Sequence, residues 1–134
     1  MAASKAIQII LTRQLASCVA MPILLIDAEG TLIYYNEPAE ALLNQRFDET
    51  GEIPAREWHD LVDIADDDRH PIPLEDRPMM AALTQRLPIA RSIWVRGGSA
   101  RAGNGGWRHV SVIAFPLVGE SGQLLGATSI FWEI

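Results

Sequence analysis

The chain lacks most features that would mark a secreted protein, a membrane protein or a nucleic-acid-binding protein. Its 134 residues contain one cysteine, Cys18, which excludes an internal disulfide and a thiolate metal cluster. No apolar run approaches the roughly 20 residues that a membrane helix needs, and no signal peptide is visible. The net charge of −6 argues against a nucleic-acid-binding face, because such faces are usually basic. We therefore expect a cytoplasmic protein that binds neither membrane nor nucleic acid.

Catalytic and metal-binding motifs are also missing. The sequence has no Gly-x-Ser-x-Gly elbow, no phosphate-binding loop and no His-Glu-x-x-His pattern. His59, His70 and His109 are scattered, and nothing indicates an acid that would orient them. The run Asp66 to Asp68 before His70 offers oxygen and imidazole ligands, but its spacing is not that of a calcium loop. We interpret it as a solvated acidic loop and expect no metal.

The most informative stretch is residues 21–43, whose pattern predicts strand, tight turn, strand and helix. Pro22 opens an apolar run that ends at Asp27, and Gly30 can take the positive φ of a tight turn. The residues after this turn are β-branched and aromatic, as a returning strand prefers. Asn36 then stands where a helix N-cap belongs.

Two further helices and a polar connection are predicted around this stretch. Residues 4–20 have the helical period, with one apolar side formed by Ile7, Ile10, Leu11, Leu15 and Cys18. This helix either covers its own domain or pairs with a second chain, and the two roles are compatible. Residues 45–73 are polar and aperiodic, apart from one or two helical turns within 55–62. Residues 74–85 should form the next helix.

Three strands should follow, over residues 89–96, 107–118 and 123–134, with a long hairpin loop over 97–106. Both faces of these strands are partly apolar, whereas a sheet with one wet face would alternate more cleanly. One set is Ile93, Val95, Val110, Val112, Ala114 and Ile130; the other is Trp94, Trp107, Ile113, Phe115 and Phe131. We therefore expect the N-terminal helix, a second chain, or both to cover the second face.

The order and spacing of these features resemble a PAS domain. The family's opening pattern is matched by Pro22, Asp27, Gly30, Tyr35 and Asn36. A second signature is matched by Pro71-Ile72-Pro73, Glu75-Asp76 and Pro78, and a third by Phe115-Pro116-Leu117. The resemblance covers roughly residues 20–132. It implies an α+β fold with a five-stranded antiparallel sheet, helices on one face, and an N-terminal helix (1–20) against the sheet of the core (21–134).

The resemblance also implies a function. PAS domains are non-enzymatic sensory or regulatory modules of signal transduction, so we expect a homodimer, a small apolar or aromatic ligand, or both, and a downstream signalling protein as a further partner. By position, the pocket should be lined by Tyr35, Trp58, Met80, Leu83, Ile93 and Phe115. The dimer interface should be formed by Ile7, Ile10, Leu11 and Leu15. A ligand-free dimerisation module and a small α+β enzyme with an unrecognised site are the alternatives.

No cofactor is expected, although the sequence leaves two open. The Asn-Cys-Arg motif of light-sensing flavin members is absent, and so is a core cysteine for a covalent chromophore. Haem-binding members usually supply a histidine from the helix before the third strand, and residues 74–85 contain none. Haem held by His59, His70 or a methionine, and flavin held without a covalent bond, remain open. It also remains open whether the chain stands alone or is the N-terminal part of a longer protein.

Overall fold

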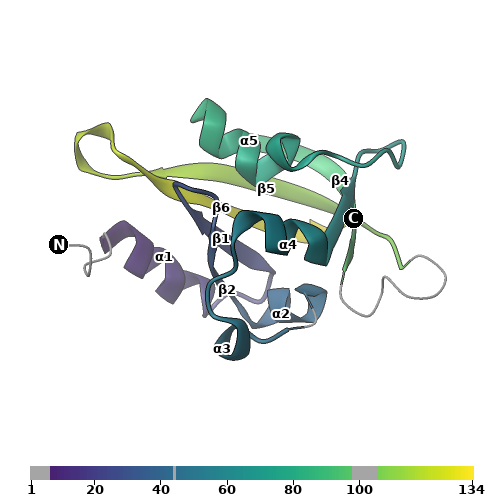
Figure 1. The fold of residues 1–134 in the computed structure, drawn as a ribbon, viewed down its shortest axis with the longest axis horizontal. Helices are drawn as coiled ribbons and strands as arrows, with labels where there is room; N and C mark the ends of the chain where they lie inside the picture. Colours follow the sequence, from purple (N-terminus) through teal and green to yellow (C-terminus); the bar gives the residue numbers. More distant parts are fainter. Residues whose placement is uncertain (1–6, 44, 98–105) are drawn as a thin grey trace.

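A computed structural model describes residues 7–43, 45–97 and 106–134 (Figure 1). Six strands form one antiparallel sheet in the order β2-β1-β6-β5-β4-β3. The strands are β1 Ile23–Asp27, β2 Leu32–Tyr35, β3 Val62–Ala65, β4 Ile89–Gly97, β5 Arg108–Val118 and β6 Leu124–Glu133. The helices are α1 Ile7–Ala16, α2 Glu37–Leu43, α3 Phe47–Thr50, α4 Ala55–Leu61 and α5 Pro78–Gln85, with 3-10 turns at Leu74–Asp76 and Glu120–Gly122. The predicted α+β fold class is confirmed.

The sheet has one strand more than the sequence predicted. β3 lies inside the segment that we interpreted as aperiodic, and it begins directly after α4. It forms an edge of the sheet beside β4, where Asp63 stands opposite Arg96 and the two form an ion pair at 2.9 Å. Cross-strand pairs of opposite charge stabilise antiparallel sheets. The prediction missed β3 because four residues with a charge in the middle carry too little periodicity.

One face of the sheet packs against α2, α4 and α5 and contains the main core. The helices contribute Ala39, Leu42, Leu43, Trp58, Met79, Ala82 and Leu83, all buried. From the central strands come Ile93, Val95, Val110, Val112, Ala114 and Phe131. In the register of β5 and β6, Val112 pairs with Phe131 and Ile113 with Ile130, so Phe131 faces the core and Ile130 does not. The predicted alternation was wrong for these two residues, because it placed Ile130 in the set with Ile93 and Phe131 in the opposite set.

The N-terminal helix α1 covers part of the opposite face of the sheet. Ile9 and Ala16 are its buried residues, and Ile9 packs in a second apolar cluster with Leu25 and Ile33. In Figure 1 this helix stands apart from α4 and α5, beside β1 and β2. The predicted helix began at residue 4, and residues 4–6 lie outside the described residues, as do residues 98–105 of the predicted hairpin loop. No helix of the described ranges is long and apolar enough to cross a bilayer.

Asn36 connects three of these elements through its buried side chain. Its Oδ1 accepts hydrogen bonds from the backbone N–H of Ile23 at 3.0 Å and of Ala39 at 3.2 Å. Its Nδ2 donates to the carbonyl oxygens of Ala16 at 3.0 Å and Met21 at 2.9 Å. The predicted N-cap of α2 is therefore also the residue that attaches the end of α1 and the start of β1 to that helix.

We expect Asn36→Ala to lower the free energy of unfolding by about 3 kcal/mol, because it leaves several buried backbone groups without partners. Chemical denaturation of both proteins measures this. The exposed Gln85→Ala is the control and should change stability by less than about 0.5 kcal/mol. A loss at position 36 no larger than the control's would refute the connecting role of Asn36.

Candidate functional site

A small cavity lies inside the core, between the helices and the inner face of the sheet. Its volume is about 40 Å³. Its walls are almost entirely apolar, and the buried residues Trp58, Ile93, Val112, Phe131 and Arg77 all line it. By volume it holds roughly three waters or a ligand of about four or five non-hydrogen atoms. It is far below the ~300 Å³ at which pockets for drug-sized ligands begin.

The structure brings together only part of the predicted pocket. Trp58 and Ile93 line the cavity, and the indole Nε1 of Trp58 donates to the carbonyl oxygen of Gly30 at 3.1 Å. Tyr35 and Leu83 are buried in the same core but do not reach the cavity wall. The Tyr35 hydroxyl instead lies 2.9 Å from the Thr50 hydroxyl.

The other two predicted residues lie elsewhere. Met80 is half-buried at the edge of the core, where its side chain packs near Gly30. Phe115 follows Ala114, which is fully buried in the core, so the alternation of β5 turns Phe115 to the opposite face of the sheet. The pocket was predicted by position, although the alternation of the late strands already placed Phe115 in the set opposite to Ile93.

The prediction also missed Arg77, the one charged residue among the described residues that line the cavity. We expected one helix over 74–85, but it is divided: a 3-10 turn ends at Asp76 and α5 starts at Pro78. Arg77 between them is extended, with φ −63° and ψ 147°. A proline disfavours helical backbone at the residue before it. The Arg-Pro step was therefore a readable signal for the break that turns this side chain into the core.

A wider groove lies outside this cavity. It has a volume of about 540 Å³ and is lined by residues that include His59, Asp63, Arg96 and Trp107. Arg77 and Ile64 line both the groove and the cavity. These two side chains therefore form the partition between the core and the surface.

His59 faces this groove with one buried ring nitrogen. No hydrogen-bond partner is present for its Nδ1 within the described residues. Burial lowers the pKa of His59, and the positive charge of Arg77 lowers it further. The folded protein therefore favours the neutral imidazole.

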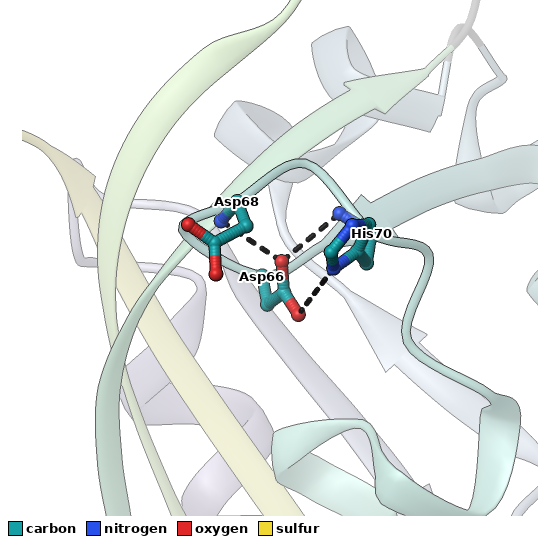
Figure 2. A group of neighbouring side chains, drawn as sticks. All are labelled: Asp66, Asp68 and His70. Atoms are coloured by element: carbon teal, nitrogen blue, oxygen red, sulfur yellow. Dashed lines mark hydrogen bonds and ion pairs between the residues drawn. The ribbon is translucent and has the colours of Figure 1, made fainter.

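The acidic segment before α5 is a mostly exposed turn held by its own hydrogen bonds (Figure 2). Asp66 Oδ1 accepts hydrogen bonds from the backbone N–H of Asp68 and His70, both at 2.9 Å. Its Oδ2 lies 3.8 Å from the His70 Nδ1. These backbone hydrogen bonds lower the pKa of Asp66. The three side chains could come within reach of one ion, but the turn accounts for their proximity, so the absence of a metal remains our prediction.

Asp67 attaches the same turn to the outer face of the sheet. It accepts a hydrogen bond from the Ser92 hydroxyl at 3.0 Å and lies 3.3 Å from the His109 Nε2. His109 stacks on Trp94 with ring centroids 4.4 Å apart. The acid that the sequence did not indicate is thus present beside His109. Ser92, however, donates to the carboxylate and not to the imidazole, so the nucleophile–base contact of a hydrolytic site is not formed by these residues.

The described residues do not fit a haem or a flavin. The cavity of about 40 Å³ cannot contain either ring system, and the lining residues that the structure describes include no histidine or cysteine. His59 and His70 lie outside it, on the groove and on an exposed turn.

Comparison with solved structures identifies the fold. The PAS domain of BvgS from Bordetella pertussis superposes with a TM-score of 0.66 at 20% identity, over 96% of this chain and 88% of that chain. A PAS domain from Colwellia psychrerythraea gives 0.61 at 18% identity, over 93% and 97%. The PAS domain of nitrogen regulation protein NR(II) from Vibrio parahaemolyticus gives 0.57 at 16%, over 92% and 98%. No protein-family model and no curated protein sequence matches the chain. The chain has the PAS fold, which confirms the resemblance seen in its sequence.

We expect freshly purified protein to show no visible absorption band, because the described part of the core has neither the volume nor the ligands for a chromophore. An absorption spectrum together with native mass spectrometry checks this. A band from stoichiometric haem or flavin would contradict the prediction and would require the cavity to expand.

We expect the protein to lose stability as the pH falls below about 6.5, the ordinary pKa of histidine. The folded pKa of His59 is lowered, so its contribution is complete above the unfolded pKa and is lost as the pH falls toward the folded pKa. His59→Gln should flatten the curve of unfolding free energy against pH in this window. Equal curves for His59→Gln and the parent would refute the assignment.

Proposed function

We propose that the chain is a non-enzymatic PAS-type sensory or regulatory domain of signal transduction that works as a homodimer. One observation carries this proposal: the exposed side of α1 is apolar. Ile7, Ile10, Leu11 and Leu15 are between 43% and 66% exposed. Because Ile9 and Ala16 already attach this helix to the sheet, the four aliphatic side chains are available to a partner.

A second copy of the chain is the occupant that best fits this surface. The outer face of the sheet also exposes apolar side chains, among them Ile113 at 39% and Trp132 at 36%. Burying a large aliphatic side chain contributes roughly 1.5–3 kcal/mol. A two-fold interface buries the same surface on both partners, so one apolar helix per chain is sufficient for a self-complementary contact.

A signal would pass from the cavity to this interface through β5 and β6. Val112 and Phe131 line the cavity, whereas the neighbouring Ile113 and Trp132 are on the exposed face. A ligand shifts the arrangement of a dimer only if it binds one arrangement better than the other. The output would be read by a downstream signalling protein, and a cytoplasmic setting remains our expectation.

The small cavity supports a second candidate function, a ligand-free dimerisation module. A core of about 40 Å³ excludes most metabolites in this conformation. Both candidates share the homodimer and differ only in whether the core is occupied. An enzyme is less well supported, because the Asp67, His109 and Ser92 cluster is not arranged as a nucleophile and its base.

We expect Ile7→Glu with Leu11→Glu to convert the dimer to a monomer, because two charges would enter an apolar contact. Both side chains are more than half exposed within one chain, so the monomer should keep its melting temperature. Sedimentation at several concentrations measures the association. The control is Thr84→Glu with Gln85→Glu, which adds the same charge at exposed positions of α5 and should remain dimeric.

Two results would contradict this proposal in different ways. A parent protein that stays monomeric at high micromolar concentration would refute the homodimer. A double variant that stays dimeric would refute α1 as the interface.

A further inference from the structure

Arg77 is a buried cation with most of its hydrogen-bonding capacity unused. Its side chain is 4% exposed. Nη2 donates to the carbonyl oxygen of Val62 at 2.9 Å. Nε and Nη1 are also buried, and neither has a hydrogen-bond partner within the described residues. Buried polar atoms are nearly always paired with protein, water or ligand, so two such atoms on one guanidinium require an explanation.

The charge on this side chain persists at neutral pH. Burial lowers the pKa of Arg77 to about 10, and the acids Asp63 and Asp60 oppose that shift. The carboxylate of Asp63 is bonded to Arg96, through both Nε at 3.1 Å and Nη2 at 2.9 Å. Neither acid forms a hydrogen bond with the free nitrogens of Arg77. A buried charge without a paired counter-charge is costly, and apolar replacements at such positions are often stabilising.

The position of Arg77 favours a ligand as the missing partner. The side chain lines an otherwise almost wholly apolar cavity, and with Ile64 it separates that cavity from the open groove. An anion arriving through the groove would meet the guanidinium first. Arginine and carboxylate form short, charge-assisted hydrogen bonds of matching geometry. The remaining walls, which include Ile93, Val112 and Phe131, suit an alkyl group.

We propose that the core cavity binds a short-chain monocarboxylate, such as acetate or propionate, with its carboxylate on Arg77 and its alkyl end against the apolar walls. The volume of about 40 Å³ limits the ligand to this size class. A phosphate fits less well, because its additional oxygens would face apolar side chains and lose their hydrogen bonds to water. This inference rests on the proposed sensory function and names the ligand class of that domain.

The first experiment compares an acid with its neutral analogue on the unmodified protein. Sodium propionate should raise the melting temperature saturably, whereas propionamide and equimolar sodium chloride should not. Ligands of this size bind no tighter than roughly a few micromolar and commonly bind far more weakly, so the titration should extend to about 50 mM. No saturable shift with propionate, or an equal shift with propionamide, would overturn the proposal. This comparison does not depend on any variant folding.

The second experiment locates the site. Arg77→Met should weaken propionate binding by roughly 10- to 100-fold, since it removes a charge-assisted hydrogen bond. The matched control is Arg96→Met, which removes a cation that lines the groove but not the cavity. It should retain the parent's affinity. Equal loss in both variants, or none in Arg77→Met, would overturn the assignment to Arg77.

NMR titration distinguishes the cavity from the surface. Propionate should shift the methyl resonances of Ile64 and Ile93 with one saturation curve. Shifts confined to Trp107 would indicate an anion held only in the groove and would overturn the proposal. Sedimentation of the same samples separates the two hypotheses: a dimer without propionate binding refutes this inference alone, and a monomer refutes the proposed homodimer.

Discussion

The hydrogen bonds of Asn36 determine how the N-terminal part of the chain meets the sheet. One buried amide accepts from the first residue of β1 and from α2, and it donates to the end of α1. The network pairs both the oxygen and the nitrogen of this amide, so neither buried atom lacks a hydrogen-bond partner. The direction of α1 follows from this attachment, because the helix is fixed at its last residue by Asn36 and at Ile9 by apolar packing. The aliphatic side of α1 is exposed as a result of this geometry.

Arg77 occupies a comparable buried position and differs in one respect. Both side chains enter the core from the residue that precedes a helix, and both form a hydrogen bond with backbone. Asn36 is fully paired, whereas two nitrogens of Arg77 have no partner in the part of the chain that the structure describes. A neutral amide can be satisfied by neighbouring backbone alone. A guanidinium needs an anion, and the groups packed around it in the core are mainly apolar. The hydrogen bonds of Asn36 are therefore all made within the fold, whereas the unpaired nitrogens of Arg77 can bind a ligand.

The sequence predicted well wherever local chemistry decides the structure. The turn at Gly30, the cap at Asn36 and the long late strands follow from glycine freedom, capping and strand periodicity. It predicted the structure poorly where contacts between distant segments of the chain decide it. Ile9 is buried although the apolar stripe was assigned to Ile7 and Leu11, because the sheet selects the side of the helix. β3 forms because β4 offers an edge to pair with.

The cavity and the proposed interface are one residue apart along the same strand. Successive side chains of a strand point to opposite faces, so Val112 on β5 meets the cavity while Ile113 meets the outer surface. Close-packed interiors transmit small displacements because they contain little free volume. A ligand of a few atoms that displaces the cavity wall would therefore move the outer face that a second chain contacts. The coupling can be no larger than the difference in ligand affinity between the two arrangements of the dimer. A ligand this small makes one charged contact, to Arg77, and most of its binding free energy comes from that contact. The shift between the two arrangements of the dimer therefore depends on whether this contact forms equally well in both.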